Sequence, residues 1–172
     1  MAIVVAGSEI LTTALASSIH FLLQNPESFK ILLEEVHSSF SSEEQITSAS
    51  TTSLPYLNAV LNETLRMAPP FPGGLHREVP KGGAIIAGYA IPEGMTVSVP
   101  CWSMFPSASN FTSPDIFVPE RWLKDADSKL ESEQVEMGDK KEAFHPFSLG
   151  PHGCIGQPLA WMEMRLILSR LL

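Results

Sequence analysis

The sequence of 172 residues has little cysteine, little positive charge and no long apolar run. Two cysteines, Cys101 and Cys154, are too few for a disulfide framework, which favours a reducing compartment. Eleven Lys and Arg residues stand against nineteen Asp and Glu residues, so the net charge is −8, and the basic residues form no cluster that could follow a phosphate backbone. We therefore expect no nucleic-acid partner.

No segment approaches the roughly 18 consecutive apolar residues that a membrane-spanning helix needs. The first residues also lack the basic region that opens a signal peptide. The last residues, 166–172, form an apolar run without a helix-ending signal. The sequence therefore predicts no membrane segment in this chain. We also expect both ends of the chain to be truncated.

Hydrophobic periodicity predicts a mainly α-helical fold with a small antiparallel β-sheet. Apolar residues recur with helical spacing in four segments: 1–24, 26–39, 54–68, and from Ile155 to the C-terminus. The last of these is apolar on most sides, so we expect it to be buried. Asn25 is a favourable N-cap for the second of these helices. Strands are predicted over 75–79, 84–89 and 95–99, with a turn at 91–94 joining the last two.

Polar segments separate these elements. Residues 38–53 contain ten Ser and Thr residues in sixteen, which predicts a flexible loop. Residues 100–122 are rich in proline and serine and predict short helices with irregular packing. Residues 124–142 are highly charged without apolar periodicity, and we expect a solvated insertion with no function.

Cys154 lies in a glycine-rich loop, Phe147-Ser-Leu-Gly-Pro-His-Gly-Cys-Ile-Gly156, directly before the last predicted helix. A lone cysteine is most often a small buried hydrophobic residue. It can also be the nucleophile of a cysteine hydrolase or a thiol-redox protein, with His145 or His152 as the base, although the sequence has no C-x-x-C motif.

The spacing F-x-x-G-x-x-x-C-x-G of this loop resembles the haem-binding loop of the cytochrome P-450 family of haem-thiolate monooxygenases. The resemblance implies that Cys154 binds the haem iron axially as a thiolate, a ligand that favours O–O cleavage. It also implies that Phe147 packs under the porphyrin. His152 stands where the family carries a residue that hydrogen-bonds a haem propionate.

Two further motifs extend the resemblance. Glu63 and Arg66 form E-x-x-R on the predicted helix 54–68, and with the Arg121 of Pro119-Glu-Arg-Trp122 they resemble the family's structural triad. The alternative is a solvated pair on the face opposite the apolar stripe. Trp122 stands where the family often has phenylalanine. Arg77 stands where the family has a propionate-binding arginine, and its alternative is an exposed charge at the sheet edge.

The first predicted helix carries Ala6-Gly-Ser-Glu9, which resembles the family's oxygen-binding groove. The family's threonine is replaced by Ile10, so a proton-delivering hydroxyl would have to come from Thr12 or Thr13. In the alternative, these two hydroxyls donate to helix carbonyls and Glu9 lies in solvent.

The resemblance covers residues 1–172 as a single partial domain, the C-terminal portion of the cytochrome P-450 fold. Its Pro72-Gly-Gly-x-x-Arg77 segment is similar to that of filamentous-fungal members of secondary metabolism. It implies a haem-dependent enzyme that inserts one atom of dioxygen into a small apolar organic substrate, with electrons from NADPH through a separate cytochrome reductase. A full-length homologue is expected at the endoplasmic reticulum membrane, and this chain, without an anchor, in the cytoplasm. The alternatives are a truncated, inactive remnant of such an enzyme and the cysteine hydrolase or thiol-redox protein.

Overall fold

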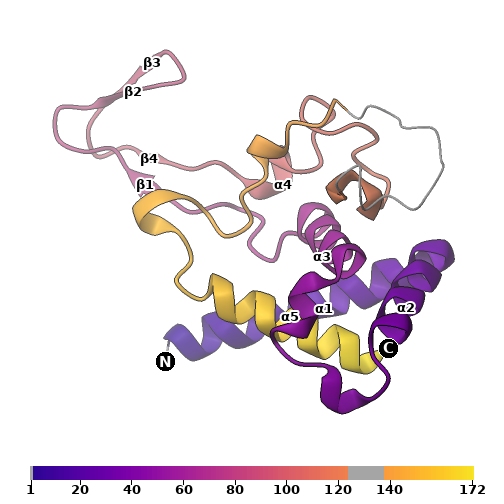
Figure 1. Ribbon diagram of the computed structural model, residues 1–172. Coiled ribbons are helices and arrows are strands. Elements are labelled where there is room, and N and C mark those ends of the chain that lie inside the picture. The colour runs from indigo at the N-terminus through magenta and orange to yellow at the C-terminus, as the bar shows by residue number, and fades with distance from the viewer. Residues whose placement is uncertain (1, 124–137) are drawn as a thin grey trace.

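Helices form the body of the molecule, and the strands extend away from it (Figure 1). The computed structural model describes residues 2–123 and 138–172. The α-helices are α1 (Ala2–Gln24), α2 (Pro26–Ser39), α3 (Pro55–Met67), α4 (Cys101–Met104) and α5 (Gln157–Leu171). The 3₁₀-helices are η1 (Glu43–Gln45), η2 (Ser50–Ser53), η3 (Pro119–Trp122), η4 (Lys141–Ala143) and η5 (Gly150–His152). The predicted fold class, mainly α with little antiparallel strand, is confirmed.

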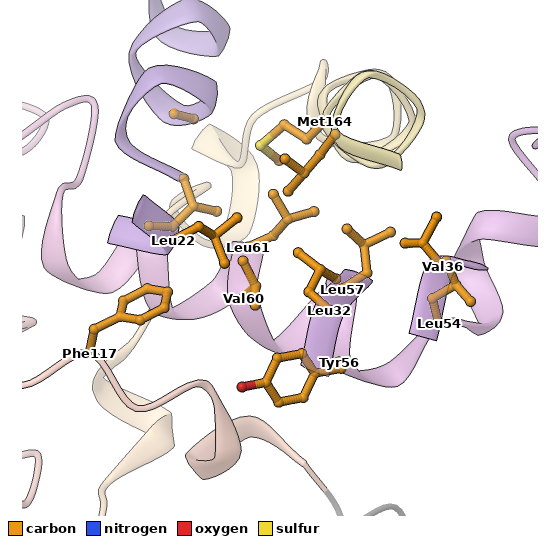
Figure 2. Close-up of a cluster of buried hydrophobic side chains, with 13 residues drawn as sticks. Leu22, Leu32, Val36, Leu54, Tyr56, Leu57, Val60, Leu61, Phe117 and Met164 are labelled. Atoms are coloured by element: carbon orange, nitrogen blue, oxygen red, sulfur yellow. The ribbon is translucent and has the colours of Figure 1, made fainter. Parts of the chain in front are cut away.

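Helix α3 lies at the centre of the hydrophobic core and contacts α1, α2, α5 and η3. Its apolar stripe places Leu57, Val60 and Leu61 against Leu22 of α1 and Met164 of α5, and all five side chains are almost fully buried (Figure 2). Each such side chain contributes about 1.5–3 kcal/mol to folding through its burial. The packing therefore fixes α3 more firmly than its own helix propensity could.

A carboxylate from another helix caps the N-terminus of α3. Leu54 stands at the N-cap position and has no side chain that can accept a hydrogen bond. Glu35 of α2 does so instead: its Oε1 accepts from the Tyr56 N–H at 2.7 Å and its Oε2 from the Leu57 N–H at 2.8 Å. A negative charge at this end also interacts favourably with the helix dipole.

Asn25 stands at the N-cap position of α2, as predicted, but its side chain makes no capping hydrogen bond to that helix. Its Nδ2 donates to the Phe21 carbonyl at 2.8 Å, where α1 ends. The last carbonyls of a helix have no partner within the helix. The amide therefore satisfies α1, and Asn25 serves α2 only through its backbone carbonyl, which accepts from Phe29.

The prediction of a flexible loop over residues 38–53 is wrong, because this segment contains the end of α2, η1 and η2. Its hydroxyl groups bond to nearby backbone. The Ser50 Oγ donates to the Gln45 carbonyl at 2.7 Å, and the Thr51 Oγ1 donates to the Thr47 carbonyl at 2.9 Å. Thr51 and Ile46 are buried. Local side-chain bonds and one apolar anchor order a segment whose composition favours disorder.

The strands pair differently from the prediction. β1 (Arg77–Glu78) pairs with β4 (Thr96–Val97), and β2 (Ala84–Ile86) pairs with β3 (Tyr89–Ile91), giving two separate antiparallel pairs. The turn lies at Ala87-Gly88, where φ is 51° and 85°, as a two-residue hairpin turn with two positive φ angles requires. Ala-Gly lacks the usual Asn-Gly signal, so the sequence analysis missed this turn. The predicted turn at 91–94 is present, with Gly94 at φ of 75°, but the strands on either side of it do not pair, so the predicted pairing and the single sheet are wrong.

Helix α5 begins at Gln157 and is buried on one side only. The buried residues on that side are Met164, Leu168 and Ser169. Leu159 is 53% exposed and Ile167 45% exposed, so the prediction of a helix buried on most sides is wrong. Among the helices that the structure describes, none combines the length and the hydropathy needed to cross a bilayer.

Candidate functional site

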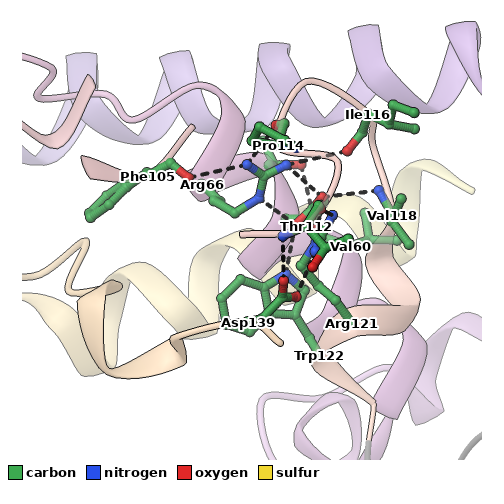
Figure 3. Close-up of polar contacts among 12 residues, drawn as sticks. Val60, Arg66, Phe105, Thr112, Pro114, Ile116, Val118, Arg121, Trp122 and Asp139 are labelled. Carbon is green, nitrogen blue, oxygen red and sulfur yellow. Dashed lines mark hydrogen bonds and ion pairs between the residues drawn. The ribbon is translucent and has the colours of Figure 1, made fainter. Parts of the chain in front are cut away.

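Glu63 is the centre of a buried polar network that joins α3 to residues 105–122. Figure 3 shows Arg66, Arg121 and Asp139, the other charged members of this network. The two carboxylate oxygens of Glu63 accept a fork from Arg66: the Nε donates to Oε2 at 2.9 Å and the Nη2 to Oε1 at 2.8 Å. Both side chains have no exposed surface. The alternative prediction of a solvated Glu–Arg pair is therefore wrong. The face of α3 opposite its apolar stripe is also buried, because residues 105–122 cover it.

Three more donors reach the same carboxylate from residues 118–122. The Arg121 Nε donates to Oε1 of Glu63 at 3.1 Å, and the Val118 N–H donates to it at 3.0 Å. The Trp122 Nε1 donates to Oε2 at 2.8 Å. The structure thus brings Glu63, Arg66 and Arg121 together, and the carboxylate accepts five hydrogen bonds, which is enough to compensate for its burial.

The remaining donors of Arg66 fix the chain between α4 and η3. Its Nη1 donates to the carbonyls of Phe105 at 3.2 Å and Pro114 at 2.7 Å, and its Nη2 donates to the Ile116 carbonyl at 3.3 Å. The guanidinium also lies 5.3 Å from the centre of the Phe111 ring. Every N–H of this arginine therefore has an acceptor, which is the condition under which a buried charge is tolerated.

Asp139 also belongs to this network, and the sequence analysis missed it. Its Oδ2 lies 2.6 Å from the Arg121 Nη1, and its Oδ1 accepts from the Thr112 N–H at 2.7 Å. Its side chain is 1% exposed, so the prediction of a solvated insertion is wrong at this residue, while residues 124–137 lie outside the described residues. A lone aspartate in a charged run gives no periodic signal that could have identified it.

Cys154 is exposed, on a loop whose backbone hydrogen bonds fix its course. The Cys154 N–H donates to the Phe147 carbonyl at 2.8 Å, and the Cys154 carbonyl accepts from the Gln157 N–H, at the start of α5, at 3.2 Å. Gly150 has φ of +63°, a conformation that favours glycine. Leu149 is 60% exposed and Ile155 fully exposed. The sulfur is therefore accessible and is flanked by apolar side chains that face solvent.

Of the other residues that the resemblance assigns to the haem, Phe147 and His152 lie in the same loop as Cys154, and Arg77 lies on β1. The Phe147 ring lies 5.9 Å from the ring of Trp161 on α5 and is partly buried. His152 is exposed in η5. Arg77 is half-buried on β1, and its Nη1 donates to the His76 carbonyl at 2.8 Å. The imidazole of His152 is therefore open to solvent, and the guanidinium of Arg77 is partly so.

The threonines near Glu9 donate to their own helix. The Thr12 Oγ1 donates to the Ser8 carbonyl at 2.8 Å, and the Thr13 Oγ1 donates to the Glu9 carbonyl at 2.9 Å. All three side chains are exposed. This arrangement matches the alternative prediction, in which the two hydroxyls donate to helix carbonyls and Glu9 lies in solvent.

Within the described ranges, 2–123 and 138–172, no group of three or more His, Cys, Asp or Glu side chains is arranged to hold a metal ion.

Comparison with known proteins gives one consistent result. The chain matches the family model described as Cytochrome P450 over residues 1–172. The cytochrome P450 monooxygenase astJ of Aspergillus oryzae is 46% identical over 168 residues, which are 97% of this chain and 32% of that protein. The cytochrome P450 monooxygenase atr2 of Stereocaulon alpinum is 45% identical over 170 residues, covering 99% of this chain and 32% of that protein. The cytochrome P450 monooxygenase tpeC of Talaromyces stipitatus is 44% identical over 172 residues, covering 100% and 32%. The chain spans 32% of the length of each of these relatives.

Proposed function

The chain belongs to the cytochrome P450 family, and from this we propose that Cys154 supplies the axial thiolate of a haem. The protein to which the chain corresponds would insert one atom of dioxygen into a small apolar organic substrate. Its electrons would come from NADPH through a cytochrome reductase. The fungal relatives, each described as a monooxygenase, support this reaction class, and a role in secondary metabolism is part of the proposal.

The accessible sulfur of Cys154 is the observation that carries the proposal. Thiolate is a soft ligand that suits iron. The exposed Leu149 and Ile155 beside it suit an apolar macrocycle, which would remove their surface from water. A haem with a thiolate ligand supplies the electron-transfer and dioxygen chemistry. The residues present therefore fit this group.

Three other residues would hold the haem in place. Phe147, already packed on Trp161, would offer its ring to the macrocycle. His152, exposed on η5, and Arg77, half-buried on β1, would each donate hydrogen bonds to a propionate. A carboxylate accepts charge-assisted hydrogen bonds from such donors, which are stronger than neutral ones.

The triad of Glu63, Arg66 and Arg121 would act at a distance from the haem by fixing η3 to α3. Proton delivery by Glu9 with Thr12 or Thr13 remains a prediction. It would require the two hydroxyls to leave the Ser8 and Glu9 carbonyls to which they donate.

The experiment is a haem titration of the purified chain and of two variants, Cys154→Ser and Cys101→Ser. We expect the chain and the Cys101→Ser variant to give the red-shifted Soret band of a thiolate-ligated, reduced carbonyl complex, and Cys154→Ser to lose it. Cys101 is the matched control because it is the other cysteine and is only partly exposed. Haem uptake by the unmodified chain without this band, or a band that persists in Cys154→Ser, would contradict the ligand assignment.

The same proteins distinguish the alternatives. Burial raises the pKa of the Cys101 thiol, so iodoacetamide is expected to label Cys154 first. Stoichiometric labelling of Cys154 without any haem uptake would favour a cysteine hydrolase or thiol-redox protein. A thiolate spectrum without product formation in the presence of a reductase would indicate an inactive remnant.

A further inference from the structure

The buried network around Glu63 contains two positive charges, and the predicted triad supplies only one negative charge. Arg66 and Arg121 face the single carboxylate of Glu63, and their side chains have no exposed surface. Asp139 is the fourth member of this network, and we propose that it is also a positioning residue, which fixes residues 139–144 and through them the Cys154 loop. The part of the proposal that concerns the Cys154 loop depends on the proposed function.

Charge balance is the first argument for Asp139. Three members alone would bury a formal charge of +1, which is costly away from water. The Asp139 carboxylate, 2.6 Å from the Arg121 Nη1 and 1% exposed, brings the formal charge of the group to zero. It accepts from the Nη1 of Arg121, whereas Glu63 accepts from the Nε, so the two carboxylates bind different nitrogens of one guanidinium.

Asp139 also joins segments of the chain that are distant in sequence. Its Oδ1 accepts from the Thr112 N–H at 2.7 Å, and the next residue, Lys140, donates its N–H to the Asn110 carbonyl at 2.7 Å. Arg121 in turn donates to the Thr112 carbonyl at 3.1 Å. The chain at residues 139–140 is therefore tied by backbone and side-chain bonds to residues 110–112 and to η3.

This attachment continues toward the haem loop. The Phe144 ring lies 4.6 Å from the ring of Trp122 and 5.0 Å from that of Phe105. Phe147, whose carbonyl accepts from the Cys154 N–H, follows three residues later. Residues 139–144, which we call the approach segment, are thus attached at Asp139 and at Phe144. Through them, the buried ion network sets the course on which the chain reaches Cys154.

The test compares Asp139→Asn with Asp115→Asn in the 172-residue chain. Asp115 is exposed in the same part of the fold, so it controls for the loss of one surface charge. Asp139→Asn keeps an acceptor for the Thr112 N–H but removes the negative charge that lies 2.6 Å from the Arg121 Nη1. We expect the folding equilibrium constant of Asp139→Asn to fall at least about tenfold, since buried charges left unpaired are costly. We expect that of Asp115→Asn to stay within roughly twofold.

Two further measurements address positioning. Trypsin cleavage after Lys140 and Lys141 reports opening of the approach segment, and cleavage after Lys30 of α2 reports global unfolding. Asp139→Asn is expected to raise the first rate more than the second. At saturating haem, it is also expected to lower the fraction with the thiolate spectrum. Asp139→Glu, which restores the charge, is expected to recover part of both losses and serves as the test variant if Asp139→Asn does not fold.

Equal behaviour of Asp139→Asn and Asp115→Asn in unfolding, or an unchanged ratio of the two cleavage rates, would overturn the inference. Loss of stability with a wild-type thiolate fraction at haem saturation would overturn the positioning role. The proposed function fails separately, through the absence of the thiolate band in the unmodified chain. In that event the unfolding and cleavage comparisons still decide whether Asp139 belongs to the network and attaches the approach segment.

Discussion

Glu63 has no exposed surface and accepts five hydrogen bonds from four residues, whereas Cys154 is exposed on a loop that approaches α5. At Glu63 each added donor restricts the positions of the others. At Cys154 the backbone is fixed by hydrogen bonds while the sulfur stays accessible. The difference separates the residues that maintain the fold from the residue that can bind a ligand. Changes at Glu63 should therefore appear first in unfolding and reach ligand binding only through the course of the Cys154 loop, whereas changes at Cys154 should appear in ligand binding alone.

The largest expected effect is at Glu63. Glu63→Ala leaves Arg66 and Arg121 buried without their shared anion, and we expect the free energy of unfolding to fall by about 3–5 kcal/mol. Glu63→Gln keeps the size of the side chain but turns one end into a donor that faces other donors, so a smaller loss is expected. Chemical denaturation followed by circular dichroism measures both.

Glu34→Ala is the matched control, because Glu34 is an exposed glutamate on a helix. Its effect should stay within about 0.5 kcal/mol. If Glu63→Ala lowered the free energy of unfolding as little as this control, the buried network would contribute little to folding. Glu63 would then not differ from Cys154 in its role in the fold.

The next effect appears at alkaline pH and concerns Tyr56, at the start of α3. Burial, together with the hydrogen bond from its hydroxyl to Glu120 Oε1 at 2.7 Å, raises the pKa of Tyr56 and outweighs a hydrogen bond with Ser28. In the unfolded chain a tyrosine loses its proton near pH 10. The folded state keeps the proton to higher pH. The contribution of Tyr56 to the free energy of unfolding is therefore fully present below about pH 10, and it decreases above that pH by up to about 1.4 kcal/mol per pH unit.

Tyr56→Phe should remove this part of the pH dependence, and Tyr89→Phe should not. Tyr89 is the only other tyrosine in the sequence and is 73% exposed. Unfolding free energies measured between pH 8 and 11 give the slopes. Parallel curves for all three proteins would show that the Tyr56–Glu120 contact between α3 and η3 does not discriminate between protonation states.

Sequence motifs predicted the parts of the molecule that depend on local spacing. Glu63 and Arg66 lie one helical turn apart, so a helical prediction already places them together, and the resemblance supplied Arg121. The helices α1, α2 and α3 also follow from apolar periodicity to within about two residues at each end. In each case the information lies within a short window of sequence.

The parts that the sequence did not predict depend on partners distant in the chain. Glu35 caps α3 from α2, and Asp139 binds Arg121 after a separation of 18 residues, and neither leaves a periodic pattern. The hairpin turn at Ala87-Gly88 uses an alanine with positive φ, which turn statistics disfavour. One exposed face on α5 likewise cannot be inferred from an apolar sequence alone, since burial depends on what packs against it.

The smallest expected effect comes from removing one of the five donors to Glu63, the indole N–H of Trp122, by Trp122→Phe. Phenylalanine keeps a ring that can pack on Phe144 but lacks the N–H that donates to Glu63 Oε2 at 2.8 Å. Four donors would still reach the carboxylate, so the expected loss is about 1 kcal/mol, near that of one hydrogen bond. Trp102→Phe, at an indole 60% exposed, is the control and should be close to neutral. The denaturant concentrations at the unfolding midpoints, compared at equal slope of the unfolding free energy against denaturant, measure the loss of stability. A loss as large as that of Glu63→Gln would mean that the five donors act as a single unit, since removing the most peripheral one would then disable the rest.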